Sequence, residues 1–205
     1  MNIVLIAFSS FMLALSGALV PGPLFTITVS ESFRRGGKAG PLIILGHGIL
    51  ELAVVLLITL GVTPLLSTER AHFFTALAGG VILILMGLML LKDAGRASLV
   101  SDRGGTQTGM HPVVYGVLGS LSNPYWVIWW LTIGLGYLMS AMKYGVTGVF
   151  AFFCGHIAAD FLWYGLISYA VSRGRRIIGD KGYRLMLYVC GFFLLLFGGW
   201  FISSA

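Results

Sequence analysis

Charged residues are scarce in this sequence of 205 residues, and their scarcity excludes most classes of soluble protein. Lys, Arg, Asp and Glu make up 10% of the chain, whereas apolar residues make up 58%. Soluble domains contain roughly 25% charged residues. A chain of this length cannot bury so much apolar surface in a core of its own, so we expect an integral membrane protein with lipid as its main solvent.

Cysteine pairs and the motifs of intramembrane enzymes are missing as well. Cys154 and Cys190 lie in apolar segments and form no CxxC spacing, so we interpret both as packing residues. The sequence also lacks the HExxH motif of zinc proteases, and we expect neither an enzyme nor a cofactor. Residues 1–30 contain no Lys or Arg, which argues against a cleavable signal.

Six long apolar runs account for most of the chain. About 20 apolar residues are enough to cross the hydrocarbon core of a bilayer as a helix, and every run approaches or exceeds that length. The sequence therefore predicts an all-α membrane protein with six transmembrane helices in a single domain, residues 1–205. The runs cover about 3–30, 41–65, 71–91, 113–139, 145–171 and 185–203.

Basic residues gather in alternate loops between these runs. Eleven of the 13 Lys and Arg residues lie in the segments 31–40, 92–112 and 172–184. Short basic loops face the cytoplasm, so we predict that both termini face outward. The same rule explains the net charge of +6, and we expect no nucleic-acid partner.

The two halves of the chain carry the same features in the same order. Each half has three predicted spans, an odd number, so the second half must enter the membrane inverted. We therefore predict two inverted three-helix repeats, residues 1–93 and 112–205, joined by a cytoplasmic linker, residues 94–111. Secondary transporters commonly use this arrangement, with a binding site near the midplane between the repeats. The matching features are Pro21-Gly22-Pro23 with Asn123-Pro124, Gly46-His47 with Gly155-His156, and Gly80 and Gly87 with Gly191 and Gly198.

A carboxylate follows each of the two repeated histidines by four residues. His47 precedes Glu51, and His156 precedes Asp160, so each pair shares one helix face. Ionisable side chains inside a membrane span cost roughly 2.5–3.5 kcal/mol on insertion scales and are usually functional. The pairs are candidates for carrying protons, for binding an ammonium group or for binding a metal ion; the alternative is hydrogen bonding between helices.

Two proline breaks interrupt the first and fourth runs. Proline lacks a backbone donor and clashes with the preceding turn, so a helix bends or ends there. Unwound backbone at Pro21-Gly22-Pro23 and Asn123-Pro124 is suited to line a cavity, where carbonyls bind a cation and helix N-termini bind a carboxylate. The alternative is that these prolines only shape helix packing.

Side chains that follow the breaks are candidates for the cavity wall. Thr26 follows the first break, and Tyr125 and Trp126 follow the second. Threonine in a helix more often bonds to its own backbone, and tryptophan commonly marks the membrane interface. Both alternatives therefore stay open. We place the expected site at the contact of runs 1, 2, 4 and 5.

These motifs resemble those of the LysE/RhtB family of amino-acid exporters. The resemblance is carried by Pro21-Gly22-Pro23, by Ser122-Asn123-Pro124 and by the segment from Asp160 to Leu166, and it covers nearly the whole chain. It implies export of amino acids from a prokaryotic cytoplasm, driven by protons, in the cell membrane. Protons, a small-molecule substrate and lipid are then the expected partners, and the glycine-lined faces permit a homodimer.

The resemblance leaves a second function open. Tyr125 stands where many members carry lysine, and the paired His and carboxylate motifs are similar to those of an uncharacterised branch. The wider superfamily also contains exporters of divalent metals. Two imidazoles and two carboxylates suit such an ion, so the alternative is metal efflux with His47, Glu51, His156 and Asp160 as ligands.

Overall fold

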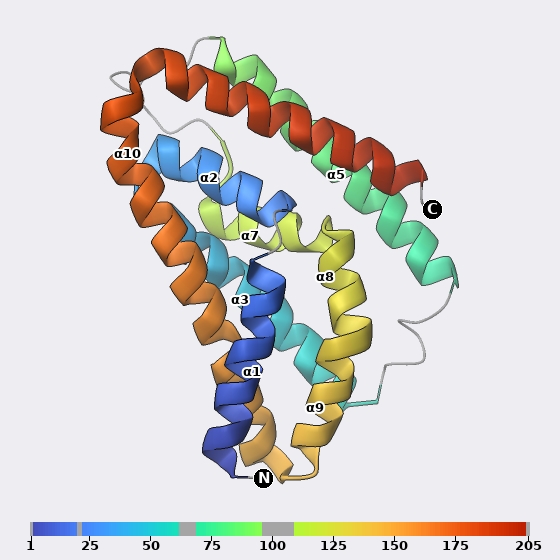
Figure 1. Cartoon of the computed structure of the whole chain (residues 1–205). Coiled ribbons are helices and arrows are strands. Elements are labelled where there is room, and N and C mark those ends of the chain that lie inside the picture. Colours follow the sequence, from blue (N-terminus) through green and yellow to red (C-terminus); the bar gives the residue numbers. More distant parts are fainter. Residues whose placement is uncertain (1, 20–21, 62–68, 96–108, 204–205) are drawn as a thin grey trace.

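The chain is helical throughout the part that the structure describes. The computed structural model describes residues 2–19, 22–61, 69–95 and 109–203, and all regular structure in these ranges is helical (Figure 1). The elements are α1 (Ile3–Ala18), α2 (Pro23–Arg35), α3 (Ala39–Thr59), α5 (Glu69–Ala94), α7 (Pro112–Leu121), α8 (Pro124–Trp129), the π-helical turn η1 (Trp130–Gly134), α9 (Leu135–Met142) and α10 (Gly145–Ser203).

Several of these helices have the length and composition of membrane spans. Among the described residues, α3 and the two parts of α10, Gly145–Gly174 and Gly179–Trp200, are each long and apolar enough to cross a bilayer. The pair α1 and α2 meets the same condition, with a bend of 79° between them. These helices agree with the prediction of an all-α membrane protein.

The helices break where the sequence places proline and glycine. Gly22 caps α2 and Pro23 is its first residue, a position where the missing N–H of proline costs nothing. In the second half, α7 ends at Leu121 and α8 begins at Pro124, with the Asn123 Oδ1 accepting from the Tyr125 N–H at 3.1 Å. The apolar runs 3–30 and 113–139 are therefore broken helices. Pro21 lies outside the described residues.

The segment predicted to connect the fifth and sixth spans, residues 172–184, does contain the break between Gly145–Gly174 and Gly179–Trp200, but it is helical and not an irregular loop. The chain stays helical through this segment and turns at Gly179, whose φ of 67° is readily adopted only by glycine. Basic residues are good helix formers, so their presence does not end the helix. The predicted loop 31–40 is likewise reduced to residues 36–38, and residues 96–108 of the predicted linker lie outside the described residues.

Glycines allow two pairs of helices to cross in direct backbone contact. A Cβ at Gly46 of α3 would lie 1.9 Å from the Val113 carbonyl oxygen of α7, and a Cβ at Gly155 of α10 would lie 2.1 Å from the Ala7 carbonyl oxygen of α1. Small residues commonly occupy such crossings in membranes, because dispersion contacts between backbones replace the hydrophobic effect. These crossings bring α3 and the first part of α10 toward the centre of the molecule.

A second set of glycines joins α5 to the last part of α10, and the two helices run side by side (Figure 1). A Cβ at Gly80 would lie 2.7 Å from the Gly198 carbonyl oxygen, and a Cβ at Gly87 would lie 2.8 Å from that of Gly191. The four glycines that match in the sequence therefore face one another in space.

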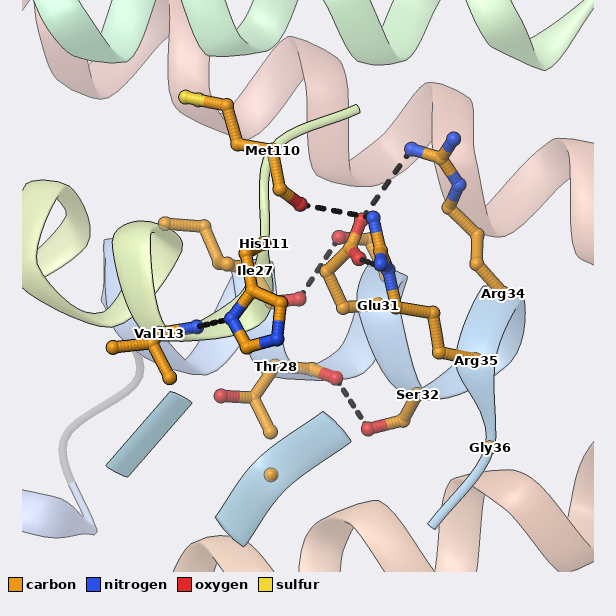
Figure 2. A network of polar contacts seen from close by, with 12 residues as sticks. Ile27, Thr28, Glu31, Ser32, Arg34, Arg35, Gly36, Met110, His111 and Val113 are labelled. Atoms are coloured by element: carbon orange, nitrogen blue, oxygen red, sulfur yellow. Dashed lines mark hydrogen bonds and ion pairs between the residues drawn. The ribbon is translucent and has the colours of Figure 1, made fainter. Parts of the chain in front are cut away.

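A buried ion network fastens the C-terminal end of α2 (Figure 2). Glu31 is 1% exposed and accepts from Arg35 Nε at 2.5 Å and from Arg34 Nη1 at 3.3 Å. Arg35 also donates from Nη2 to the Met110 carbonyl oxygen at 2.9 Å. These charge-assisted bonds tie α2 to the segment that leads into α7, so both broken helices are held close to each other.

We predict that Gly116→Ala lowers the stability of the purified protein. The new Cβ would lie 1.9 Å from the Ile43 carbonyl oxygen, so α3 and α7 would have to separate; overpacking of this kind costs about 1–3 kcal/mol. The melting temperature in detergent measures the change.

The matched control is Gly165→Ala. Gly165 is a helical glycine whose Cβ would have no heavy atom within 4 Å, so this change should leave the melting temperature the same or raise it. Equal effects of the two substitutions would show that the α3–α7 contact is not tight.

Candidate functional site

The two pairs of histidine and carboxylate meet in one buried cluster. His47 and Glu51 lie on α3, and His156 and Asp160 lie on the first part of α10. Each side chain offers one nitrogen or oxygen atom that could bind a metal ion, and these four atoms all lie within 4.8 Å of one another. All four residues are at most 4% exposed. The contact between α3 and α10 thus joins groups that are more than 100 residues apart in sequence.

Each imidazole faces both carboxylates. The His47 Nε2 lies 3.1 Å from Glu51 Oε1 and 3.6 Å from Asp160 Oδ2. The His156 Nε2 lies 3.0 Å from Glu51 Oε2 and 3.6 Å from Asp160 Oδ2. Both imidazoles are therefore nearer to Glu51 than to Asp160.

Indole groups add to the donors around Glu51. Trp126 and Trp130 donate from Nε1 to Glu51 Oε1 at 3.1 and 3.0 Å. Hydrogen bonds to a charged group are stronger than neutral ones, and more so where water is excluded. Two tryptophans and two histidines together hold this carboxylate in place. The second proline break positions both indoles, because α8 starts at Pro124 and continues into the π-helical turn at Trp130.

A serine on α7 orients the first histidine. Ser120 Oγ lies 2.6 Å from His47 Nδ1 and donates its proton to the Gly116 carbonyl oxygen at 2.7 Å. A hydroxyl has only one proton to donate, so Ser120 accepts from the Nδ1–H of His47. The other nitrogen, Nε2, then faces Glu51, and the short distance between them requires a further proton there. His47 and Glu51 together hold that proton.

The Asp160 side of the cluster has fewer partners. Among the described residues, three buried atoms of the cluster have no hydrogen-bond partner: Asp160 Oδ2, His156 Nδ1 and Glu51 Oε2. An unpaired polar group in such surroundings costs about 1–3 kcal/mol. The two carboxylates are therefore unequal at one oxygen only: Glu51 Oε1 accepts from two indoles, whereas Glu51 Oε2 and Asp160 Oδ2 have no hydrogen-bond partner among the described residues.

A pocket opens beside the cluster, with about 430 Å³ of space when the adjoining open solvent is included. Its wall combines small residues of α1, the start of α2, both sides of the second break and the four ionisable groups. The lining residues are Ala14, Gly17, Ala18, Leu24, His47, Glu51, Ser120, Asn123, Tyr125, Trp126, Trp129, His156, Asp160 and Tyr164. Aromatic and small apolar side chains thus enclose a few polar groups, as in most small-molecule sites.

Most residues of the expected site lie in or beside this pocket. Asn123, Tyr125 and Trp126 line it, and a Cβ at Gly22 would lie 3.5 Å from Asn123 Nδ2, so the two breaks are adjacent. Pro23 and Pro124 are the first residues of α2 and α8. Pro21 lies outside the described residues.

Thr26 is buried on α2 but does not line the pocket. Its neighbours Thr28 and Ser30 bond to the carbonyl oxygens of Leu24 and Ile27 in their own helix. These two hydroxyl groups therefore bond to the backbone of their own helix, which was the alternative to a role in the cavity wall.

Among the pocket residues that were not anticipated from the sequence, two carry hydroxyl groups, Ser120 and Tyr164. Tyr164 follows Asp160 by four residues, so helical spacing would have placed it on the same face. Ser120 follows Gly116 by four residues, but nothing in the sequence relates it to His47. That contact depends on how α7 crosses α3.

The nitrogen and oxygen atoms of the cluster can bind either a cation or a proton. Imidazole nitrogen and carboxylate oxygen bind zinc and manganese, and the same groups accept hydrogen bonds from an ammonium. The surrounding aromatic side chains exclude water and strengthen all such interactions. These features define a helical membrane protein with a buried ionisable pocket.

Comparison with known proteins identifies the family. The model of the LysE type translocator family matches residues 15–205, so the chain belongs to this family, and it is a transporter. It is also 25% identical over 202 residues to a protein of Bacillus subtilis (strain 168) named "Putative amino acid efflux protein YcgF", covering 98% of this chain and 95% of that protein. No solved structure matches the chain significantly. The resemblance inferred from the motifs is confirmed.

We predict that Ser120→Ala destabilises the protein although it removes only one oxygen atom. The Nδ1–H of His47 would lose its buried acceptor, at a cost of about 1–3 kcal/mol. Thermal unfolding in detergent measures the loss. Ser140→Ala is the control, because its hydroxyl bonds only to the Gly136 carbonyl oxygen of its own helix. A melting temperature equal to that of the control would exclude an important role for the Ser120–His47 bond.

Proposed function

We propose that this protein exports amino acids or related small metabolites and couples their movement to protons. Membership of a family of translocators gives the class, and the name of the Bacillus subtilis relative supports an amino acid as substrate. The observation that carries the proposal is the buried cluster of two histidines and two carboxylates on the wall of a pocket. A pocket of this kind brings a charged substrate into contact with groups that exchange protons.

The contacts of the two halves support an inverted repeat and alternating access. Gly46 packs on the Val113 carbonyl oxygen as Gly155 packs on that of Ala7. In the same way, the contact between Gly80 and Gly198 has its equivalent in the contact between Gly191 and Gly87. Each contact recurs with the two halves exchanged, as a two-fold axis in the membrane plane requires. Rocking of one half against the other would then expose the pocket to each side in turn.

The cluster also suggests how a proton and a substrate exclude each other. The proton between His47 Nε2 and Glu51 is held by short contacts, whereas Asp160 Oδ2 lies 3.6 Å from both imidazoles. A cation that enters the pocket can bind Asp160 and repel protons from the neighbouring imidazoles. Exchange of the cation for a proton on the other side of the membrane returns the cluster to its starting charge.

Glu51→Gln should abolish transport driven by a proton gradient. Glutamine still accepts hydrogen bonds from both indoles but carries no charge and cannot take up a proton. The assay is accumulation of a mixture of the 20 common amino acids by liposomes that contain the purified protein, after a pH gradient is imposed.

Counterflow of amino acids without net proton movement is the control for this variant. We expect Glu51→Gln to stay folded and to retain counterflow, with a lower melting temperature because two imidazoles lose their buried anionic partner. Proton-driven accumulation at the normal rate would contradict the coupling role of Glu51.

The proposed orientation places the basic segments in the cytoplasm and both termini outside. In a variant with both native cysteines replaced by alanine, Ser203→Cys should react with a membrane-impermeant maleimide in intact cells. Lys181→Cys, in the basic segment at the turn of α10, should react only after the membrane is opened. The reverse labelling pattern would show that the basic segments face outward and the C-terminus faces the cytoplasm.

Metal efflux is a second candidate because the four donor atoms lie close enough together to hold one ion. The metal would be the cargo, bound by two imidazoles and two carboxylates. A rise of the melting temperature with Zn²⁺ or Mn²⁺, without any response to amino acids, would favour this function over the first.

A further inference from the structure

The helix α2 is polar and yet buried on every side. Each of residues 26–33 is buried, although this stretch contains Glu31 and four residues with hydroxyl groups. Polar residues inside a membrane protein commonly mark the route of a solute. The helix begins beside the pocket, where Leu24 lies, and ends at Arg35 in a basic segment. It therefore fills the space between the pocket and the basic end of the molecule, which is the proposed cytoplasmic face.

The hydroxyl groups of α2 allow this helix to move. Thr28 donates to the Leu24 carbonyl oxygen at 2.8 Å, and Ser30 donates to the Ile27 carbonyl oxygen at 2.9 Å. Bonds of this kind lie within one helix, so they persist when the helix changes its neighbours. A displacement of α2 therefore leaves neither hydroxyl unpaired.

Ser168 of α10 makes hydrogen bonds that cross from one half of the molecule to the other. This fully buried residue accepts from the Gly40 N–H at 3.0 Å and donates to the Gly37 carbonyl oxygen at 3.1 Å. Its Oγ also lies 2.8 Å from the Oγ of Ser32. One side chain thus joins α10 to α2, to α3 and to the turn between them, residues 36–38.

The backbone is closely packed at the same level. A Cβ at Gly40 would lie 2.4 Å from the Tyr164 carbonyl oxygen, so α3 and α10 are in direct contact. A Cβ at Gly37 would lie 3.2 Å from Ser172 Oγ, one turn further along α10. Tyr164 lines the pocket, so this contact begins at the pocket wall and closes the basic end of the molecule.

The matching positions at the other end of the molecule lack this arrangement. Thr59 follows the first histidine of the cluster by as many residues as Ser168 follows the second, yet among the described residues its hydroxyl bonds only within α3. The turn between α9 and α10, residues 143–145, is exposed. An apolar cluster that includes Val55 of α3 and Leu138 of α9 fills this end instead. Polar bonds of the kind that Ser168 makes therefore hold the basic end.

We propose that α2 is the gate between the pocket and the cytoplasm and that Ser168 locks this gate shut. The gate is closed in this structure. It opens when α2 and the turn after it move away from α10, which breaks the bonds of Ser168 and lets the hydroxyl groups of α2 line the route into the pocket. This proposal rests on the proposed function, because the cytoplasmic orientation and alternating access belong to that function.

Access to the pocket from the cytoplasm measures how often the gate opens. The reporter is Ala14→Cys on the pocket wall, in protein with both native cysteines replaced by alanine. Inside-out membrane vesicles present the cytoplasmic face to an impermeant methanethiosulfonate reagent, and peptide mass spectrometry gives the rate of labelling. Ser168→Ala should raise this rate about tenfold, because the hydrogen bonds that favour the closed gate are lost.

Thr59→Ala is the matched control, because its hydroxyl bonds to the carbonyl oxygens of Val55 and Leu56 in its own helix. It should leave the rate of labelling from the cytoplasm unchanged. An unchanged rate in Ser168→Ala, or an equal increase in both variants, would overturn the role of Ser168 as the lock.

A disulfide tests the gate with Ser168 in place. A Cβ at Gly37 would lie 3.9 Å from Ser172 Cβ, within the range of about 3.5–4.5 Å found in disulfides. Oxidation of Gly37→Cys with Ser172→Cys should stop labelling of the reporter from the cytoplasm, and a reductant should restore it. Each single cysteine variant with the reporter is the control. Labelling at the full rate in protein whose cross-link is verified by mass spectrometry would overturn the gate.

Labelling needs no substrate, so the gate and the exported substrate are tested separately. Labelling that ignores both Ser168→Ala and the cross-link, with proton-driven export of amino acids intact, would overturn the gate and leave the exporter standing. Labelling that responds to both changes, in protein that transports no amino acid, would support the gate and overturn the proposed substrate. A response in right-side-out vesicles instead would place the gate at the outer face and overturn its cytoplasmic assignment.

Discussion

The carboxylate of Glu51 lies in a part of the molecule where water cannot stabilise its charge. A charged group that is buried without partners costs several kcal/mol or more, and this one is 1% exposed. Its donors are His47 on α3, Trp126 on α8, Trp130 at the following π-helical turn and His156 on α10. Satisfying this single group therefore fixes the positions of three separate helical segments, and the pocket forms between them.

Backbone contacts make this convergence possible. Gly46 and Gly155 come just before the two histidines, and each lets its helix approach a neighbouring carbonyl oxygen more closely than any side chain would permit. Helices that cross at such short distances bring their polar residues within hydrogen-bond reach. The proline breaks complete the arrangement, because they turn α2 and α8 toward the cluster and place Leu24, Asn123 and Tyr125 on the pocket wall.

The near symmetry of the two halves makes their differences informative. Glu51 and Asp160 hold matching positions in the two motifs, yet among the described residues only Glu51 accepts from indole groups. Ser120 and Ala14 also hold matching positions, yet only Ser120 bonds a histidine. Both differences lie on the Asp160 side and face the same pocket.

Local properties of the sequence were enough to predict much of this protein. Long apolar runs predict helices in lipid, prolines and glycines predict where they break, and a spacing of four residues predicts each histidine–carboxylate pair. The connection predicted for residues 172–184 lies where two spans separate, but it is helical because charge does not end a helix, and the φ of Gly179 turns the chain there.

Only the tertiary structure decides which helix faces meet. It places His156 against Glu51, brings Ser120 to His47 and leaves Glu51 Oε2 and Asp160 Oδ2 without hydrogen-bond partners among the described residues. Sequence spacing gives the face of each residue on its own helix, but distances between helices depend on crossing angles set by packing. The ionisable residues of the site were therefore readable from the sequence, whereas the inequality of its two carboxylates was not.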